Sequence, residues 1–221
     1  MRFAPLAFVA VCAASLVAAT PAFADTFTVF STPTSTYVAD TTNYGGGNGS
    51  ESFTNGVGPF TFSSSLDQLT VPNTWNNWGS PPNTQSPDPN VLYDQSGTTL
   101  LLTLAPGSNV AGFEMEADDF GTYSFNVSFY DEHGVLIDTI TQSPTTGYPN
   151  GGALQFALED TTPGQTIGSI QIGAPTGGFA IAQLSAGDIA STPEPSSLVM
   201  LGTGLIGIAG MARRRLNPVQ A

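Results

Sequence analysis

The feature that most constrains the fold is a series of short stretches in which apolar and polar side chains alternate. In the segment Phe113-Glu114-Met115-Glu116-Ala117, the apolar residues fall on one side of an extended chain and the two acids on the other. The same alternation recurs in Tyr123–Phe129. Gly and Pro separate these stretches, and no window between residues 25 and 190 has a convincing helical period. The pattern predicts an all-β domain over residues 25–190, folded as an antiparallel β-sandwich.

Turn residues divide this domain into short expected strands, with no helix between them. Besides the two stretches above, the expected strands are Thr26–Phe30, Pro59–Ser63, Thr98–Leu104, Val135–Thr141, Ala153–Leu158, Ile167–Ile172 and Gly178–Leu184. Asp131–Gly134 is predicted to be the turn of a hairpin, and Gly45–Gly49 and Pro72–Asn90 are predicted to be long surface loops. Among sandwiches, this number of short strands favours a jelly roll.

The charge of the chain excludes one class of partner. The formal net charge is -13, with 4 Lys and Arg against 17 Asp and Glu. The basic residues are Arg2, Arg213, Arg214 and Arg215, so the body between residues 25 and 192 has none, whereas it holds all but one of the acids. A body without cations cannot neutralise phosphates, and we therefore expect no nucleic-acid partner.

The N-terminus has the order of a secretory signal peptide. Arg2 precedes an apolar run from Leu6 to Ala19, and the small residues Ala22 and Ala24 come directly before the expected cleavage site, which lies between Ala24 and Asp25. Cleavage after Ala24 by signal peptidase would also remove the only cysteine.

The C-terminus combines three features in a fixed order. Pro193, Glu194 and Pro195 are followed by a glycine-rich apolar segment over residues 198–212, and then by a basic cluster formed by Arg213, Arg214 and Arg215. This arrangement resembles the PEP-CTERM sorting signal. The resemblance implies that Pro193-Glu194-Pro195 is the motif recognised by an exosortase, that the apolar segment is a helix held transiently in the inner membrane, and that the three arginines are retention charges.

The resemblance implies an exported protein of the envelope, outer surface or extracellular matrix of a Gram-negative bacterium, associated with exopolysaccharide. A permanent single-span anchor is the alternative interpretation of the C-terminal segment. The expected organisation is a signal peptide over residues 1–24, the sandwich over 25–190, the sorting signal over 191–215 and a short tail over 216–221. The body itself resembles galactose-binding-like jelly rolls in the order of Gly112–Glu116, Phe125–Asp131 and Gly178–Leu184.

The densest acidic group consists of Glu114, Glu116, Asp118 and Asp119. Oxygen ligands at the end of a strand could bind Ca²⁺, and paired carboxylates could hydrolyse a glycoside. The simpler interpretation is a solvated strand face that prevents edge-to-edge pairing. We expect this simpler interpretation to hold, with no resident cofactor and no enzymatic activity.

Trp75 and Trp78 are the only tryptophans, and His133 is the only histidine. Indole rings flanked by amides suit the stacking of a sugar, so the two tryptophans are a candidate carbohydrate-binding patch, with packing inside the domain as the alternative. His133 has no cysteine partner in the expected mature chain, and its place in a turn predicts a solvated side chain. A surface protein associated with polysaccharide is thus the first expectation, a carbohydrate-binding module the second and an extracellular hydrolase the third.

The two predicted processing sites can be tested together by mass spectrometry of the protein recovered from each fraction of its host cell. We expect a mature form that starts at Asp25 and ends near Pro193. A form that retains Arg213, Arg214 and Arg215 in the inner membrane would show a permanent anchor and contradict sorting.

Overall fold

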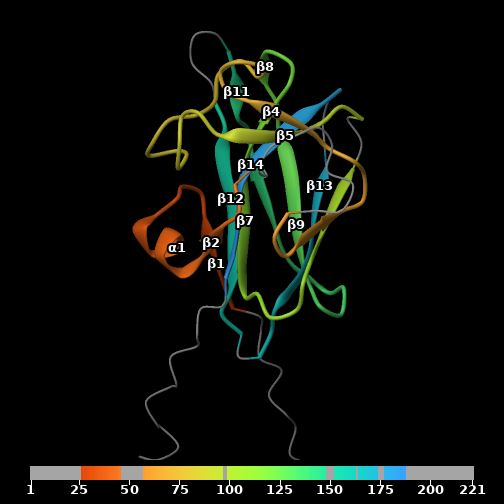
Figure 1. The fold of residues 1–221 in the computed structure, drawn as a ribbon. Coiled ribbons are helices and arrows are strands. Elements are labelled where there is room, and N and C mark those ends of the chain that lie inside the picture. The colour runs from red at the N-terminus through yellow and green to blue at the C-terminus, as the bar shows by residue number, and fades with distance from the viewer. Residues whose placement is uncertain are drawn as a thin grey trace, which may run out of the picture.

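The computed structural model describes residues 26–45, 57–96, 99–147, 152–162, 164–173 and 177–187. These residues form two facing antiparallel sheets (Figure 1). The larger sheet has the strand order β1 (Phe27–Phe30), β12 (Leu154–Asp160), β7 (Val110–Ala117), β14 (Phe179–Gly187), β5 (Asn90–Asp94) and β4 (Asp67–Thr70), with β2 (Thr42–Asn43) also paired to β14.

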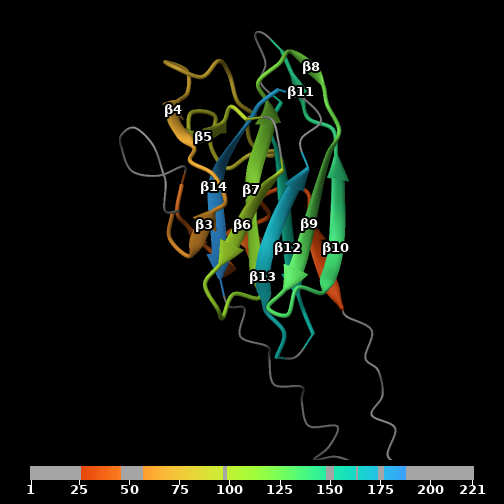
Figure 2. The ribbon, with the colours of Figure 1, turned by 90° about the vertical axis from the view of Figure 1, so that its right-hand side faces the viewer.

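The second sheet lies across the core from the first and faces the viewer in Figure 2. Its five strands follow the order β10 (Leu136–Gln142), β9 (Phe125–Asp131), β13 (Ile167–Gly173), β6 (Leu100–Leu104) and β3 (Phe60–Phe62). At one end, β8 (Gly121–Thr122) and β11 (Thr145–Thr146) form a small two-stranded sheet. All the strand pairs are antiparallel, as short hairpin and crossover connections allow.

The alternation in sequence determines which side chains fill the space between the sheets. On β7, Phe113 and Met115 point into the core and are fully buried, and Phe125 of β9 faces them from the other sheet. The ring of Phe125 meets that of Phe179 edge to face, with centroids 6.0 Å apart. Each such side chain contributes roughly 1.5–3 kcal/mol through the burial of apolar surface. This core holds the two sheets together.

The expected sandwich is confirmed, and each strand predicted from alternation overlaps one of the observed strands. The expectation that no helix interrupts the strands is wrong, because α1 (Ser35–Asp40) follows β1. Its first turn is stabilised by the Thr34 hydroxyl, which accepts a hydrogen bond from the backbone N–H of Tyr37 at 3.2 Å. Strands β4 and β5 were also not expected, because β4 has a single apolar residue, Leu69, and β5 has three consecutive apolar residues, so neither shows alternation.

The signal helix and the C-terminal apolar helix expected from sequence lie outside the described residues. Within the described residues, no helix is both long enough and apolar enough to cross a membrane.

The long segment between β4 and β5, residues 71–89, is named here the covering loop. The sequence predicted a surface loop over Pro72–Asn90, and this is wrong for its interior, because Trp75, Trp78 and Thr84 are buried. The covering loop packs on the outer face of the larger sheet, where α1 covers the neighbouring area (Figure 1). The central strands β12, β7 and β14 of the larger sheet are therefore buried on both faces.

Candidate functional site

Two acids lie beneath the covering loop. Glu114 and Glu116 alternate with the core residues of β7, so their side chains are on the outer face of the larger sheet. Strand β7 is central, between β12 and β14. The covering loop closes over this part of the strand, and both glutamates have no exposed surface. The expectation of a solvated acidic face is therefore wrong for Glu114 and Glu116.

Each buried carboxylate accepts a hydrogen bond from a tryptophan of the covering loop. The indole Nε1–H of Trp78 donates to Oε2 of Glu114 at 2.9 Å. The Nε1–H of Trp75 donates to Oε1 of Glu116 at 2.6 Å. Hydrogen bonds to an ionised acceptor are stronger than those between neutral groups. The two indoles thus attach the covering loop to the central strand of the sheet.

Backbone donors occupy the second oxygen of each acid. Oε1 of Glu114 accepts from the N–H of Gln85, and Oε2 of Glu116 accepts from the N–H of Gly152 at 3.1 Å. All four carboxylate oxygens therefore have a donor, as buried charged groups require.

Burial also shifts the titration of both acids. Desolvation raises the pKa of Glu114 and of Glu116 to about 7, although the hydrogen bonds from the indole and backbone donors lower it in part. Carboxyl groups with a pKa near neutral pH occur at catalytic sites, but burial alone also raises a pKa to this range. Here the covering loop separates both acids from solvent.

The structure divides the four acids that were considered for calcium. Asp118 and Asp119 follow the end of β7 and are exposed, whereas Glu114 and Glu116 lie under the covering loop. The hydroxyl of Tyr93 donates to Oδ2 of Asp118 at 2.7 Å. Among the described residues, no three His, Cys, Asp or Glu side chains are grouped so that they could hold a metal ion. The expectation of no resident cofactor, with calcium as the alternative, stays a prediction of the sequence.

The two tryptophans are placed inside the domain, not on its surface. Trp75 and Trp78 are 6% and 4% exposed, and the ring of Trp75 packs against Tyr93 with centroids 5.3 Å apart. The sequence offered packing inside the domain as the alternative to a sugar-binding patch, and the structure shows this packing. Stacking of a sugar on either ring would require this loop to move.

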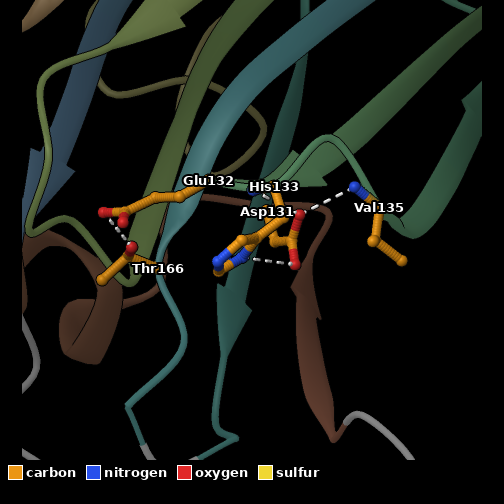
Figure 3. Close-up of polar contacts among 5 residues, drawn as sticks. All are labelled: Asp131, Glu132, His133, Val135 and Thr166. Carbon is orange, nitrogen blue, oxygen red and sulfur yellow. Dashed lines mark hydrogen bonds and ion pairs between the residues drawn. The ribbon is translucent and has the colours of Figure 1, made fainter.

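His133 lies in the turn between β9 and β10 (Figure 3). Its Nδ1 is 3.5 Å from Oδ2 of Asp131, and Oδ1 of Asp131 accepts hydrogen bonds from the backbone N–H groups of His133 and Val135 at 2.8 and 2.7 Å. The imidazole is 78% exposed, as expected for a solvated turn residue. In the same turn, Glu132 accepts a hydrogen bond from the Thr166 hydroxyl. These contacts stabilise the hairpin turn.

A comparison with protein-family models adds the C-terminal part of the chain. Residues 191–215 match the PEP-CTERM protein-sorting motif, which confirms the resemblance found in the sequence. The PEP-CTERM motif indicates an exported protein of the cell envelope that is processed by an exosortase.

The residues expected to direct processing all lie outside the described part of the chain. The matched range includes the sorting motif and the three retention charges, which are Pro193, Glu194, Pro195, Arg213, Arg214 and Arg215. The residues of the expected signal cleavage site, Ala22 and Ala24, are likewise not described. The roles of these individual residues therefore stay predictions of the sequence.

The other comparisons give little more. No curated protein matches this chain. One solved structure that matches is the enzymatically active domain of tailspike protein 4 from bacteriophage CBA120, with 20% sequence identity and a TM-score of 0.32. The match covers 58% of this chain and 19% of the tailspike chain, so it spans about a fifth of that protein's length. A similarity this low carries no argument about activity.

The raised pKa values of Glu114 and Glu116 predict how stability depends on pH. Between pH 4.5 and 7 the folded protein binds more protons than the unfolded chain, so the free energy of unfolding falls as pH rises through this window. We expect a decrease of about 3 kcal/mol for each group across the window. In the double variant Glu114→Gln/Glu116→Gln, this part of the pH dependence should disappear.

Urea unfolding at about pH 5 and about pH 8 measures the effect. The control is Asp119→Asn, which removes an exposed carboxylate near the end of the same strand and should leave the difference between the two pH values close to that of the unmodified protein. If the free energy of unfolding changes equally between the two pH values in the unmodified protein and in the double variant, the two acids do not titrate in this range.

Proposed function

We propose that this protein is a non-catalytic component of the cell surface or extracellular matrix that associates with uncharged exopolysaccharide. The observation that carries the proposal is the PEP-CTERM motif at residues 191–215, which indicates export and sorting by an exosortase. Delivery would place the sandwich outside the inner membrane, on the outer surface of a Gram-negative cell or in the matrix around it. Anchoring by the C-terminal segment would be transient, lasting until the exosortase acts.

The state of the acids supports a non-catalytic role. A glycoside hydrolase needs two carboxyl groups on opposite sides of a substrate in an accessible cleft. Glu114 and Glu116 lie next to each other on one strand face, under the covering loop, and each of their oxygens already accepts a hydrogen bond. Among the candidates named from sequence, these two acids are thus poorly suited to hydrolysis.

The outer face of the five-stranded sheet is the surface best suited to a polysaccharide (Figure 2). The strand registers place uncharged side chains side by side along it. Its members are Thr61, Ser63, Leu101, Thr103, Asn126, Ser128, Tyr130, Leu136, Thr139, Thr141, Ser169, Gln171 and Gly173, and they are named here the neutral face. None of these positions carries an acid, although the body as a whole is strongly acidic.

Cross-strand hydrogen bonds hold the side chains of the neutral face in place. The hydroxyls of Ser128 and Thr139 are 2.8 Å apart, and the Tyr130 hydroxyl donates to Oε1 of Gln171 at 3.1 Å. Hydroxyl, amide and aromatic groups in an ordered array match the hydroxyl groups and apolar ring faces of a sugar chain.

The charge of the body favours an uncharged polymer over an acidic one. Residues 25–192 contain no Lys or Arg, so a polyanion approaching any side of the body meets net repulsion. A neutral polysaccharide on the neutral face would avoid both this repulsion and the desolvation of a carboxylate. The candidate patch of Trp75 and Trp78 is covered in the structure, so we place the contact on the neutral face instead.

The effect of an added charge tests this contact. Thr103 of β6 is exposed on the neutral face, between Ser169 and Thr61 of the neighbouring strands. Thr103→Asp should weaken the retention of the protein by neutral exopolysaccharide purified from its host about tenfold, because the new carboxylate must be desolvated. Co-sedimentation with the polymer measures retention. The matched control is Asn76→Asp, which adds the same charge to an exposed position of the covering loop and should bind normally. Equal binding by both variants would remove the neutral face from the proposal.

A further inference from the structure

A second group of polar side chains lies beside Glu114, where the covering loop and α1 approach each other over the larger sheet. Tyr37, Gln85, Glu114, Gln155 and Ser185 form this group, which is named here the polar cluster. Gln155 of β12 is directly opposite Glu114 of β7 in the strand ladder, and the backbone N–H of Gln85 donates to Glu114.

Tyr37 joins the polar cluster from α1. Its side chain has no exposed surface, and burial raises the pKa of its hydroxyl. The side chains of Ser185 and Gln155 lie near enough to the hydroxyl to lower this pKa in part, and the charge of Glu114 raises it further. Tyr37 packs in one buried cluster with Ala157, which lies on the same face of β12 as Gln155, so the tyrosine lies beside the other members of the polar cluster.

Several polar atoms of the cluster have no hydrogen-bond partner of ordinary geometry, although the side chains of Ser185 and Gln155 lie close to the Tyr37 hydroxyl. They are the hydroxyl of Tyr37, Nε2 of Gln85, and both Oε1 and Nε2 of Gln155. Tyr37 and Gln155 are fully buried. Among the described residues, only two other buried side-chain atoms lack a partner, one each on Asn77 and Asp94. Buried polar atoms without partners are costly and rare in folded proteins, so their concentration at one place points to a bound group.

A bridge of amide side chains lies at the exposed edge of the cluster and is named here the amide bridge. Nδ2 of Asn43 donates to Oε1 of Gln85 at 2.7 Å and to Oε1 of Gln183 at 2.5 Å, which joins β2, the covering loop and β14. Gln183 has a φ of 52° at the point where the register of β14 shifts, between Ala182 and Ser185. Such a bulge re-aims a side chain, and strained non-glycine residues cluster at ligand sites.

We propose that the polar cluster is a binding site for a small uncharged ligand with neighbouring hydroxyl groups, such as a hexose, which enters when the amide bridge opens. The unpartnered atoms of Tyr37, Gln85 and Gln155 include both donors and an acceptor, and a hydroxyl group can bond to either kind. Glu114 would repel an anionic ligand. This site is on the opposite sheet from the neutral face and does not depend on the binding of polysaccharide there.

The full chain carries its own reporter for this site, because Trp75 and Trp78 are its only tryptophans and Trp78 is bonded to Glu114. Titration with D-glucose, D-galactose and D-mannose should give, for at least one of them, a saturable change in tryptophan fluorescence with a Kd of about 1 mM. Gln155→Leu removes two of the unpartnered atoms and should weaken this binding at least about tenfold.

The matched control is Gln165→Leu, the same substitution in the turn before β13 and outside both proposed sites, which should leave the Kd for the hexose unchanged. If Gln155→Leu does not fold, Tyr37→Phe removes only the unpartnered hydroxyl and should weaken binding in the same direction. The absence of a saturable change for all three sugars up to about 100 mM, or a change that survives both substitutions, would overturn the site and leave the cluster with ordered water only. Failure here would not affect the co-sedimentation test, which uses a polymer and a different sheet.

Discussion

The hydrogen bonds from two indole groups to two buried carboxylates determine the arrangement of one whole side of the molecule. Without the covering loop, Glu114 and Glu116 would lie on an open sheet face, and without the acids the indole N–H groups of Trp78 and Trp75 would be buried with no acceptor. Each partner therefore requires the other. The consequence is a sheet whose central strands are buried on both faces, with a loop of irregular structure packed over them as a third layer.

The two outer faces of the sandwich consequently have different properties. The larger sheet is closed by the covering loop and α1, and its polar groups are turned inward. The smaller sheet keeps an open face of hydroxyl and amide side chains without acids. In a body with no cations, an open face without charge is the place where an uncharged polymer can approach at the lowest electrostatic and desolvation cost. A PEP-CTERM motif at the C-terminus fits a protein that works outside the inner membrane.

Alternation predicted much of the sandwich, because Phe113, Met115 and Phe125 show the period of two that a core-facing strand requires. The same pattern gave a wrong prediction for Glu114 and Glu116, which were expected to face solvent and are buried. Acids opposite apolar residues usually face solvent, and only the central position of β7 and the covering loop reverse this. One signal was present in the small residues Ala180 and Ala182, which leave room for another layer on the outer face of β14. The sequence does not show which loop fills that room, since the contacts of Trp75 and Trp78 with β7 span about 40 residues.

The exchange of the two indole protons with solvent tests the central claim most directly. Trp75 and Trp78 are the only tryptophans of the chain, so a proton–nitrogen NMR spectrum has two indole N–H signals. Substitution of either residue by Phe would assign them. Buried, charge-assisted hydrogen bonds predict that both protons are strongly protected from exchange with deuterium and that both signals shift when Glu114→Gln and Glu116→Gln are introduced one at a time. Exchange of both protons at the rate of free tryptophan would contradict the attachment of the covering loop and, with it, this account of the larger sheet.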